Sequence, residues 1–285
     1  MTRPITVRQG AGWEVAGARP AGLLGQAIDH YQGYVEKTAG PVRRREFTAG
    51  KVVFIFGLGP SITLVDPVAD GARRVDSFVA GLDDGFTITE TTGAQSGIQL
   101  NLDPLVAGRL FGLPIGRLTR EVVDFADLWG DGAGGLVEQL QAARDWSRRF
   151  DLLDRHLAPR LAAGSKPNPT VAWAWRRLRE TGGLISITEL AADIGWSRKH
   201  LATQFRDHVG LAPKAVARLM RLGAAVRALD GGGPAPELSG LALDCGYYDQ
   251  AHFIHDFRRL TGLTPTAYLR RRADDDGIPG TAAPA

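Results

Sequence analysis

The sequence predicts an α+β protein with a β-rich N-terminal domain, helices that trail it, and an all-α C-terminal domain. Three observations predict this fold class. Short strand-like segments separated by glycine and proline turns fill much of residues 43–102. An apolar stripe at helical spacing then runs from Leu136 to Leu161. Two similar helix-turn-helix patterns occupy the last third of the chain, and strands followed by helices are typical of α+β proteins.

The bulk composition is that of an ordinary globular chain. The 285 residues are 44% hydrophobic and 23% charged, which is enough material for two domains with cores of normal size. No run of about 18 apolar residues occurs, so we expect no membrane-spanning helix. The first residues show no apolar signal segment, and we expect a cytoplasmic location. The one cysteine, Cys245, excludes an internal disulfide and a cysteine-based zinc cluster.

The first hundred residues predict a small antiparallel sheet. Residues 1–40 are irregular by pattern, with one helix expected over residues 23–34. Short runs of β-branched and aromatic residues bounded by turn residues then predict strands, and their close spacing favours a β-barrel or a cupin-like domain. The expected strands cover residues 51–56, 75–80, 86–91 and 96–102.

Helices are expected to follow the sheet. Asp103-Pro104 opens a short helix that ends at Gly112, and the apolar stripe of residues 136–161 predicts either a pair of antiparallel helices or one long helix. Residues 162–170 contain two prolines and no apolar periodicity, which indicates a linker. We therefore expect a regulatory domain at 1–165, a second domain at 166–272 and a disordered tail at 273–285.

Residues 171–272 show a helical pattern almost throughout. The helices are short and most are punctuated by Gly or Pro, as in a small helical domain. The expected helices cover residues 171–181, 186–194, 197–209, 213–229, 238–245, 249–261 and 265–272.

Two segments of this region repeat one another. The segment IGWSRKHLATQFRDHVGLAP begins at Ile194, and the segment CGYYDQAHFIHDFRRLTGLTP begins at Cys245. Leucine, alanine and glycine positions match at an offset of 51 before the turn, and apolar, Arg, Gly and Pro positions match at 52 after it. In each unit a glycine permits the sharp inter-helix turn, and Ser197 or Asp249 supplies the N-cap of the second helix.

The second helix of each unit has one face suited to a DNA major groove. Leu201 with Phe205, and Phe253 with Phe257, form i, i+4 apolar pairs that predict the buried side. Arg and Lys on the opposite side can donate to guanine, Gln can bond adenine, and Ala, Thr and Ile can pack on a thymine methyl. A solvated helix face is the alternative. The predicted base-facing residues are Arg198, Lys199, Ala202, Thr203, Arg206, Gln250, Ala251, Ile254, His255 and Arg258.

The excess positive charge lies in the same region. Residues 170–272 carry 15 Lys and Arg against 9 Asp and Glu, whereas the first 169 residues carry 19 of each. This split favours a polyanionic partner for the C-terminal region, although an ordinary basic surface would show it too. Helix N-termini and nearby arginines are suited to phosphate contacts. The predicted phosphate-contacting residues are Ser197, Asp249, Arg259, Arg270 and Arg271.

Residues 171–272 resemble the DNA-binding domain of the AraC/XylS family of bacterial transcriptional regulators. The segment GYYDQAHFIHDFRRLTGLTPTAYL carries the most specific part of the resemblance, and ITELAADIGWSRKHLATQFRDHVGLAP is a weaker copy in register. The resemblance covers about a third of the chain. It implies two helix-turn-helix subdomains joined by a linker helix, specific binding to promoter DNA and an N-terminal regulatory domain.

The N-terminal domain is expected to bind a small-molecule effector, a second copy of the chain, or both, as the resemblance implies. Aromatic residues of this region can line an apolar pocket, although core packing is the more frequent role of such residues. Three arginines, Arg43, Arg44 and Arg45, can offer a handle for an acidic ligand or form a solvated strand end. The candidate pocket residues are Trp13, Tyr34, Phe54, Phe56 and Phe78.

Other functional classes find less support in the sequence. A metal-dependent enzyme needs clustered histidines, but His30 and His156 lie on different expected elements. The glycine-rich segment FGLGPS lacks the Lys-Ser/Thr of a phosphate loop. We therefore expect no catalytic residues, no metal and no cofactor. The expected partners are double-stranded DNA, a small effector, RNA polymerase if the protein activates, and a homodimer mate. An architectural or effector-independent DNA binder remains the alternative.

Overall fold

The N-terminal part of the chain is built on a seven-stranded antiparallel sheet, which we call sheet A. In the computed structural model, which describes residues 3–65, 71–231 and 236–274, the strand order is β1-β2-β3-β10-β5-β8-β11. The long strand β10 pairs with β3 on one side and with β5 on the other. These strands are β1 (Thr6–Gly10), β2 (Trp13–Ala18), β3 (Tyr31–Lys37), β5 (Val52–Gly57), β8 (Phe78–Ala80), β10 (Ala94–Leu102) and β11 (Val122–Asp124).

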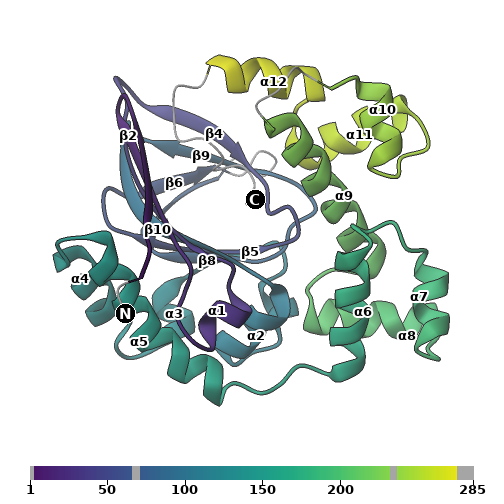
Figure 1. The fold of residues 1–285 in the computed structure, drawn as a ribbon, viewed down its shortest axis with the longest axis horizontal. Helices are drawn as coiled ribbons and strands as arrows, with labels where there is room; N and C mark the ends of the chain where they lie inside the picture. Colours follow the sequence, from purple (N-terminus) through teal and green to yellow (C-terminus); the bar gives the residue numbers. More distant parts are fainter. Residues whose placement is uncertain (1–2, 66–70, 232–235, 275–285) are drawn as a thin grey trace.

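A second, four-stranded sheet faces part of sheet A, and we call it sheet B. Its strand order is β4-β9-β6-β7, and the two sheets lie one above the other in Figure 1. The expectation of a β-rich N-terminal region is confirmed, in the form of two facing sheets. The strands of sheet B are β4 (Val42–Glu46), β6 (Ile62–Val65), β7 (Ala72–Val75) and β9 (Thr87–Thr91).

The alternation of side chains along β5 separates two environments. Phe54 and Phe56 are fully buried and belong to the main apolar core. Their neighbours Val53 and Ile55 point to the other face of the sheet, because successive side chains of a strand point to opposite faces. Sheet A therefore has helices packed on one face and sheet B on the other.

The helices of the N-terminal part cover the face of sheet A that is turned away from sheet B (Figure 1). The stripe of residues 136–161 forms two helices rather than one, because Asp145 caps a new helix with its side chain, which accepts a hydrogen bond from the Arg148 amide. These helices are α1 (Leu24–Ala27), α2 (Pro104–Phe111), the 3-10 helix η1 (Ile115–Leu118), α3 (Phe125–Trp129), α4 (Ala133–Ala142) and α5 (Trp146–Ala163).

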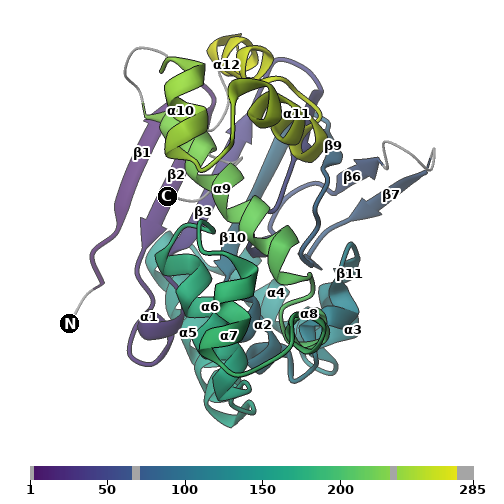
Figure 2. The same ribbon diagram turned by 90° about the vertical axis from the view of Figure 1, so that its right-hand side faces the viewer.

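The C-terminal helices follow the sequence-based expectations closely. Every expected helix is present, with ends that differ by no more than two residues among the described positions. Figure 2 shows α9 running between a group formed by α6–α8 and a group formed by α10–α12. The helices are α6 (Pro169–Glu180), α7 (Ile187–Asp193), α8 (Arg198–His208), α9 (Pro213–Asp230), α10 (Leu238–Asp244), α11 (Gln250–Thr261) and α12 (Pro265–Asp274).

The prediction for the first forty residues is wrong. The pattern of this segment predicts irregular structure with one helix over residues 23–34, but the segment forms β1, β2, the one-turn helix α1 and all of β3. Strand β3 pairs with β2 and also with β10, whose residues lie some sixty positions later in the chain. The strand expected over residues 75–80 is likewise split, since Val75 ends β7 in sheet B and Phe78 begins β8 in sheet A. Long-range pairing outweighed local pattern in both places.

A continuous apolar core connects the sheets with the C-terminal helices. One cluster of buried side chains extends from Ala16 in β2 to Tyr268 in α12. Helix α5 ends at Ala163 and α6 begins at Pro169, so the predicted boundary after residue 165 falls between them. The division into domains at 1–165 and 166–272 stays a prediction, and most of the predicted tail at 273–285 lies outside the described residues. Among the described helices, none is both long and apolar enough to cross a membrane.

Candidate nucleic-acid interface

Helices α7 and α8 form the first helix-turn-helix unit. Gly195 lies in the turn with a φ of 67°, a left-handed conformation that glycine adopts without strain. Ser197 caps α8, because its hydroxyl accepts a hydrogen bond from the His200 amide at 3.1 Å. Leu201 and Phe205 are both fully buried and fix the inner side of α8.

Helices α10 and α11 repeat this arrangement. Gly246 has a φ of 73°, and the Asp249 carboxylate accepts a hydrogen bond from the His252 amide at 2.7 Å. Phe253 and Phe257 are fully buried, with their ring centroids 5.6 Å apart. The two units therefore agree in turn, cap and buried pair, as the sequence repeat predicts.

The predicted base-facing residues share the outer sides of the two recognition helices. Those that the structure leaves exposed are Arg198, Lys199, Thr203, Arg206, Gln250, Ala251, His255 and Arg258, while Ala202 and Ile254 are half-buried. The Thr203 hydroxyl donates to the Lys199 carbonyl of its own helix at 3.2 Å, so its methyl group and the acceptor lone pairs of its oxygen are left for contact.

The cations of these two faces lack the carboxylate partners that Arg44, Arg120 and Arg259 have. Within the described residues, no carboxylate lies within 4.0 Å of the charged nitrogens of Arg198, Lys199, Arg206 or Arg258. A cation without a nearby carboxylate keeps its full attraction for an external anion. Both helices thus present uncompensated positive charge beside groups that can contact bases.

The predicted phosphate-contacting residues occupy three kinds of position. Ser197 and Asp249 are both engaged as helix caps, and the carboxylate of Asp249 is itself an anion that repels phosphate. Arg270 is exposed near the end of α12. Arg271 donates to the Arg43 carbonyl in β4 at 2.9 Å, and Arg259 lies beside Asp84. Two of the three arginines therefore contact the N-terminal part of the chain, Arg271 at β4 and Arg259 at the loop between β8 and β9.

Asp84, in the loop between β8 and β9, is the centre of a cluster of charges that joins the two parts of the chain. Its carboxylate lies 2.6 Å from Arg120, 3.6 Å from Arg218 in α9 and 3.6 Å from Arg259 in α11. Burial opposes ionisation of this carboxyl, but the hydrogen bond from Arg120 and the three positive charges outweigh burial and hold the pKa of Asp84 below its usual value. The sequence pattern did not single out Asp84, since nothing local marks a loop carboxylate as a partner of distant helices.

The first helix-turn-helix unit also contacts the N-terminal part. The Thr119 hydroxyl donates to the Gly210 carbonyl at the end of α8 at 2.8 Å. The indole N–H of Trp175 in α6 donates to the buried carboxylate of Asp103 at 2.5 Å. The groups α6–α8 and α10–α12 are therefore each held against the N-terminal part of the chain by polar contacts of their own.

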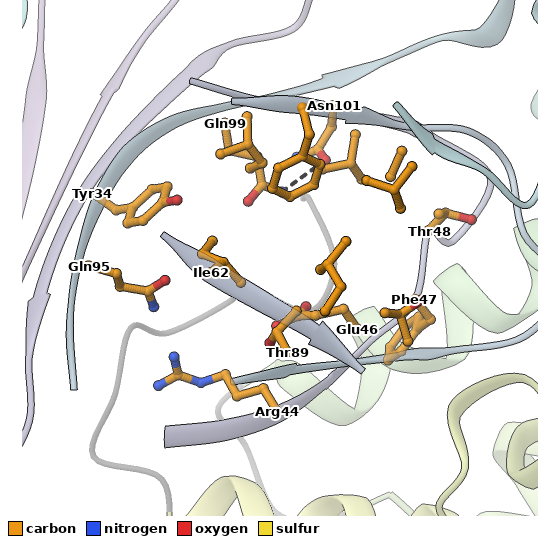
Figure 3. Close-up of a pocket in the computed structure, with 17 residues that line it drawn as sticks. Tyr34, Arg44, Glu46, Phe47, Thr48, Ile62, Thr89, Gln95, Gln99 and Asn101 are labelled. Atoms are coloured by element: carbon orange, nitrogen blue, oxygen red, sulfur yellow. Dashed lines mark hydrogen bonds between the residues drawn. The ribbon is translucent and has the colours of Figure 1, made fainter. Parts of the chain in front are cut away.

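A pocket lies between the two sheets (Figure 3). Its cavity volume is about 130 Å³. Apolar side chains of both sheets form much of its wall, and the remainder is formed by amides, hydroxyls and two charged groups. Figure 3 shows Tyr34, Gln95 and Arg44 at one end and Phe47 and Thr48 at the other.

The structure divides the candidate pocket residues into two groups. Tyr34 and Phe78 line the pocket. Phe54 and Phe56 point into the main core instead, because their side chains lie on the face of β5 opposite to the pocket. Trp13 packs against Tyr34 but is not one of the residues that line the pocket. The sequence did contain a signal for the polar wall, since amides alternate with apolar residues along β10. Gln95, Gln99 and Asn101 face the pocket, whereas Ile98, Leu100 and Leu102 are fully buried in the core.

A buried ion pair forms part of the pocket wall. Both terminal nitrogens of Arg44 donate to the Glu36 carboxylate, at 2.8 and 2.6 Å, and the Gln95 amide donates to the same carboxylate at 2.5 Å. The Glu36 side chain is only 2% exposed. Burial, reinforced by the carboxylates of Glu46 and Glu36, raises the pKa of Tyr34, so its phenol stays protonated at neutral pH.

The three consecutive arginines of β4 have separate environments. Arg43 forms a surface ion pair with Glu90 at 3.1 Å, and Arg45 lies over the Phe86 ring at 5.7 Å. Arg44 alone faces the pocket. Because successive side chains of β4 point to opposite faces, only Arg44 of the three can contact a ligand in the pocket, and it is already paired with Glu36.

One end of the pocket adjoins the contact with the C-terminal helices. The Thr48 hydroxyl, which lines the pocket, donates to the Asp83 carbonyl at 3.2 Å, one residue before Asp84. The next residue of the same turn, Ala49, packs closely against Gly223 of α9. A methyl group added at Gly223 would be only 3.7 Å from the Ala49 Cβ. The turn after β4 therefore forms part of the pocket wall and also part of the contact between the N-terminal sheets and the C-terminal helices.

The lone cysteine and the possible metal ligands were candidates for reactive chemistry, and the described residues place them as follows. Cys245 is buried at the end of α10, and burial raises the pKa of its thiol, which disfavours the reactive thiolate. No group of three or more His, Cys, Asp or Glu among the described residues is arranged to hold a metal ion.

Comparison with known proteins gives one sequence match and several structural ones. A family described as "Helix-turn-helix domain" matches residues 190–271, which contain both units. An apo variant of ToxT from Vibrio cholerae strain SCE256 is similar in structure, with a TM-score of 0.50 and 10% identity over 84% of this chain and 97% of that chain. At this identity the likeness shows the fold alone. No curated protein sequence matches the chain.

Two more distant structures cover different parts of the chain. The C-terminal domain of AraT, a response regulator from Geobacillus stearothermophilus, has 20% identity and a TM-score of 0.35 over 38% of this chain and 89% of that one. Another ToxT structure from strain SCE256, described as unsaturated fatty acid bound, has 10% identity and a TM-score of 0.44 over 82% of this chain and 96% of that one.

Proposed function

We propose that this chain, whose residues 190–271 form an AraC-type helix-turn-helix domain, is a sequence-specific DNA-binding transcriptional regulator. The observation that carries the proposal is the pair of exposed recognition faces on α8 and α11. Each follows a capped turn, and each carries uncompensated cations beside side chains that can contact base edges.

The linker helix gives the two faces a spacing that suits one face of a DNA duplex. Helix α9 has 18 residues, which at about 1.5 Å per residue makes it roughly 27 Å long. With the turns at its ends, it can hold two recognition helices about 34 Å apart, the length of one DNA turn. One chain would then contact two successive segments of the major groove.

The roles of individual residues follow from their positions. Arg198, Arg206 and Arg258 would donate to guanine edges, and Gln250, the first residue of α11, would bond adenine. Arg270 would contact phosphate. For Ser197 and Asp249 the structure supports a contribution through the helix N-termini that they cap, rather than through their own side chains.

The pocket between the sheets is the proposed effector site. It is enclosed enough to hold a small molecule, and it shares the turn after β4 with the joint that holds α9 and α11. A ligand that shifts this turn would change the contacts of Asp84 with Arg218 and Arg259, and so the freedom of the recognition helices.

The expected partners are promoter DNA and a small effector. A homodimer mate, RNA polymerase in the case of an activator, and a cytoplasmic location remain part of the proposal. An effector-independent architectural DNA binder is the main alternative. It would bind all duplexes with similar affinity, because its contacts would be to phosphates only.

A selection experiment tests the proposal. The full chain is mixed with a pool of random duplexes, and the retained fragments are sequenced and then competed against bulk DNA at a stated salt concentration. A regulator should retain a common motif and prefer it by at least ~10³-fold. Equal affinity for selected and bulk DNA would leave only the architectural alternative.

Replacing Gln250 with alanine should cost about 1–3 kcal/mol of binding free energy and relax specificity at one base pair. Arg198→Ala should do the same at a base pair in the other half of the site. Gel-shift titrations against all single-base variants of the selected motif measure both effects. Arg270→Ala is the matched control, because loss of a phosphate contact should weaken every sequence evenly and lower the salt slope by about one. If Gln250→Ala left the base preference unchanged, α11 would not contact bases as proposed.

Replacing Asp84 with asparagine should strengthen DNA binding by about three- to tenfold at low salt. The change keeps the size of the side chain but removes the charge that holds Arg218 and Arg259. Salt-dependent DNA titrations measure the gain. Asp83→Asn is the matched control, because it removes a neighbouring charge that lies 4.0 Å from Arg120 and within ion-pair distance of neither of these arginines. An equal gain in both variants would mean that net charge alone, and not release of the two arginines, explains the effect.

A further inference from the structure

The charge balance of the pocket indicates what it can hold. Its described wall contains one cation, Arg44, and one carboxylate, Glu46, with the carboxylate of Glu36 directly behind Arg44. The guanidinium of Arg44 already donates two parallel hydrogen bonds to Glu36, which is the strongest pairing geometry for this group.

An organic anion would therefore find little to compensate its charge in this pocket. A buried carboxylate without a cationic partner carries a desolvation penalty of several kcal/mol. It would have to take Arg44 from Glu36, which would leave Glu36, only 2% exposed, without its cation. Glu46, the other charged residue of the described wall, offers the ligand no positive charge.

The remaining polar groups of the wall suit an uncharged polar ligand. Side-chain amides and hydroxyls both donate and accept hydrogen bonds, so they can match an amide or hydroxyl group on a ligand. The phenol of Tyr34 stays protonated because burial raises its pKa. These polar residues are Tyr34, Thr48, Thr87, Thr89, Gln95, Gln99 and Asn101.

The apolar part of the wall and the volume set the size of the ligand. Five side chains from three strands form a continuous apolar surface, namely Val53, Ile55, Ile62, Leu64 and Phe78. The volume of about 130 Å³ is close to the ~150 Å³ of an engineered protein cavity that holds benzene. A single ring or a chain of similar size therefore fits.

We propose that the pocket between the two sheets binds a small uncharged molecule with an apolar body and an amide or hydroxyl group, and that it discriminates against organic anions. This inference rests on the proposed function of the pocket as an effector site. It names the chemical class of the effector, and it assigns to the Glu36–Arg44 pair the role of excluding anions.

Benzamide and benzoate test the proposal, since they share one ring and nearly one shape but differ in charge at pH 7.5. Binding to the full chain is measured by calorimetry, and by the shift of the melting temperature, up to millimolar ligand. Benzamide should bind at least about tenfold more tightly than benzoate, a difference of ~1.4 kcal/mol. Equal or tighter binding of benzoate would overturn the proposal, and so would binding of neither compound.

Two variants link the preference to the pocket. Glu36→Gln keeps the shape of the side chain but releases Arg44 from its charge partner, so benzoate should gain at least about tenfold in affinity. Glu90→Gln is the matched control, because Glu90 pairs with Arg43 on the surface, and both affinities should stay unchanged. Melting curves of each variant verify folding. If Glu36→Gln fails to fold, Glu46→Gln serves instead, with a smaller gain for benzoate expected.

A pocket-filling variant identifies the binding site. Ala80 lines the pocket, and Ala80→Leu should abolish benzamide binding while the chain still melts cooperatively. Benzamide binding that survives this change would place the ligand elsewhere and refute the assignment. None of these measurements uses DNA. A negative result here would refute the proposed class of ligand, whereas a negative result in the DNA selection would refute the proposed regulator function.

Discussion

Replacing Phe257 with alanine should destabilise the protein by about 3–5 kcal/mol and abolish specific DNA binding. Phe257 is fully buried, and its ring packs against Phe253 at 5.6 Å and against Tyr268 of α12 at 5.7 Å between centroids. Removing the ring leaves a cavity that the rigid neighbours cannot fill. Because α11 is held by this aromatic cluster, the recognition face of the second unit would lose its orientation.

Chemical unfolding and gel-shift titration measure the two effects of Phe257→Ala. Tyr248→Ala is the matched control, because Tyr248 precedes the same helix but is 87% exposed, and its loss should change stability by no more than ~0.5 kcal/mol. Phe257→Leu should fall between the two, since it restores part of the lost volume. A Phe257→Ala variant of normal stability that still binds the selected motif would contradict the packing argument.

Replacing Glu36 with alanine should cost about 3–5 kcal/mol of stability, because it leaves the Arg44 guanidinium buried in the pocket wall without its carboxylate. The effect differs from that of Glu36→Gln, which keeps a side-chain oxygen as hydrogen-bond acceptor. Chemical unfolding of the full chain at neutral pH measures the loss.

The double variant Glu36→Leu with Arg44→Met separates the charge effect from packing. Apolar side chains in place of a buried ion pair are often neutral for stability, so the double variant should regain most of the loss. Glu90→Ala removes a comparable carboxylate from the exposed pair with Arg43, and it should cost at most ~1 kcal/mol. If Glu36→Ala cost no more than Glu90→Ala, the pair would not be a buried element of the wall.

The C-terminal helices were predictable because their signals are local. Ser186, Ser197 and Asp249 cap the helices that follow them, and prolines open α6, α9 and α12. The i, i+4 apolar pairs of α8 and α11 predicted which sides are buried, and all four aromatic or leucine side chains are fully buried. The outer faces followed from helix periodicity alone.

The N-terminal sheets were harder to predict because their pairing is not local. The local pattern of residues 1–40 does not predict the β1–β2 hairpin, and it predicts a helix at Tyr31 and Tyr34 although both belong to β3. Which of the aromatic residues reach the pocket depended on strand alternation. The register of β5 and β10 places Phe54 and Phe56 on the core face and Gln99 and Asn101 on the pocket face.

The sequence by itself determined those features of the protein that depend on interactions within one helical turn or among a few neighbouring residues. These are the two helix-turn-helix units, their caps, their buried pairs and their outward-facing cations. Only the tertiary structure decided how Asp84 gathers Arg120, Arg218 and Arg259, and how Glu36 neutralises Arg44 in the pocket wall. Most of these partners are distant in sequence, and strand pairing and helix packing bring them together, so no local pattern records them.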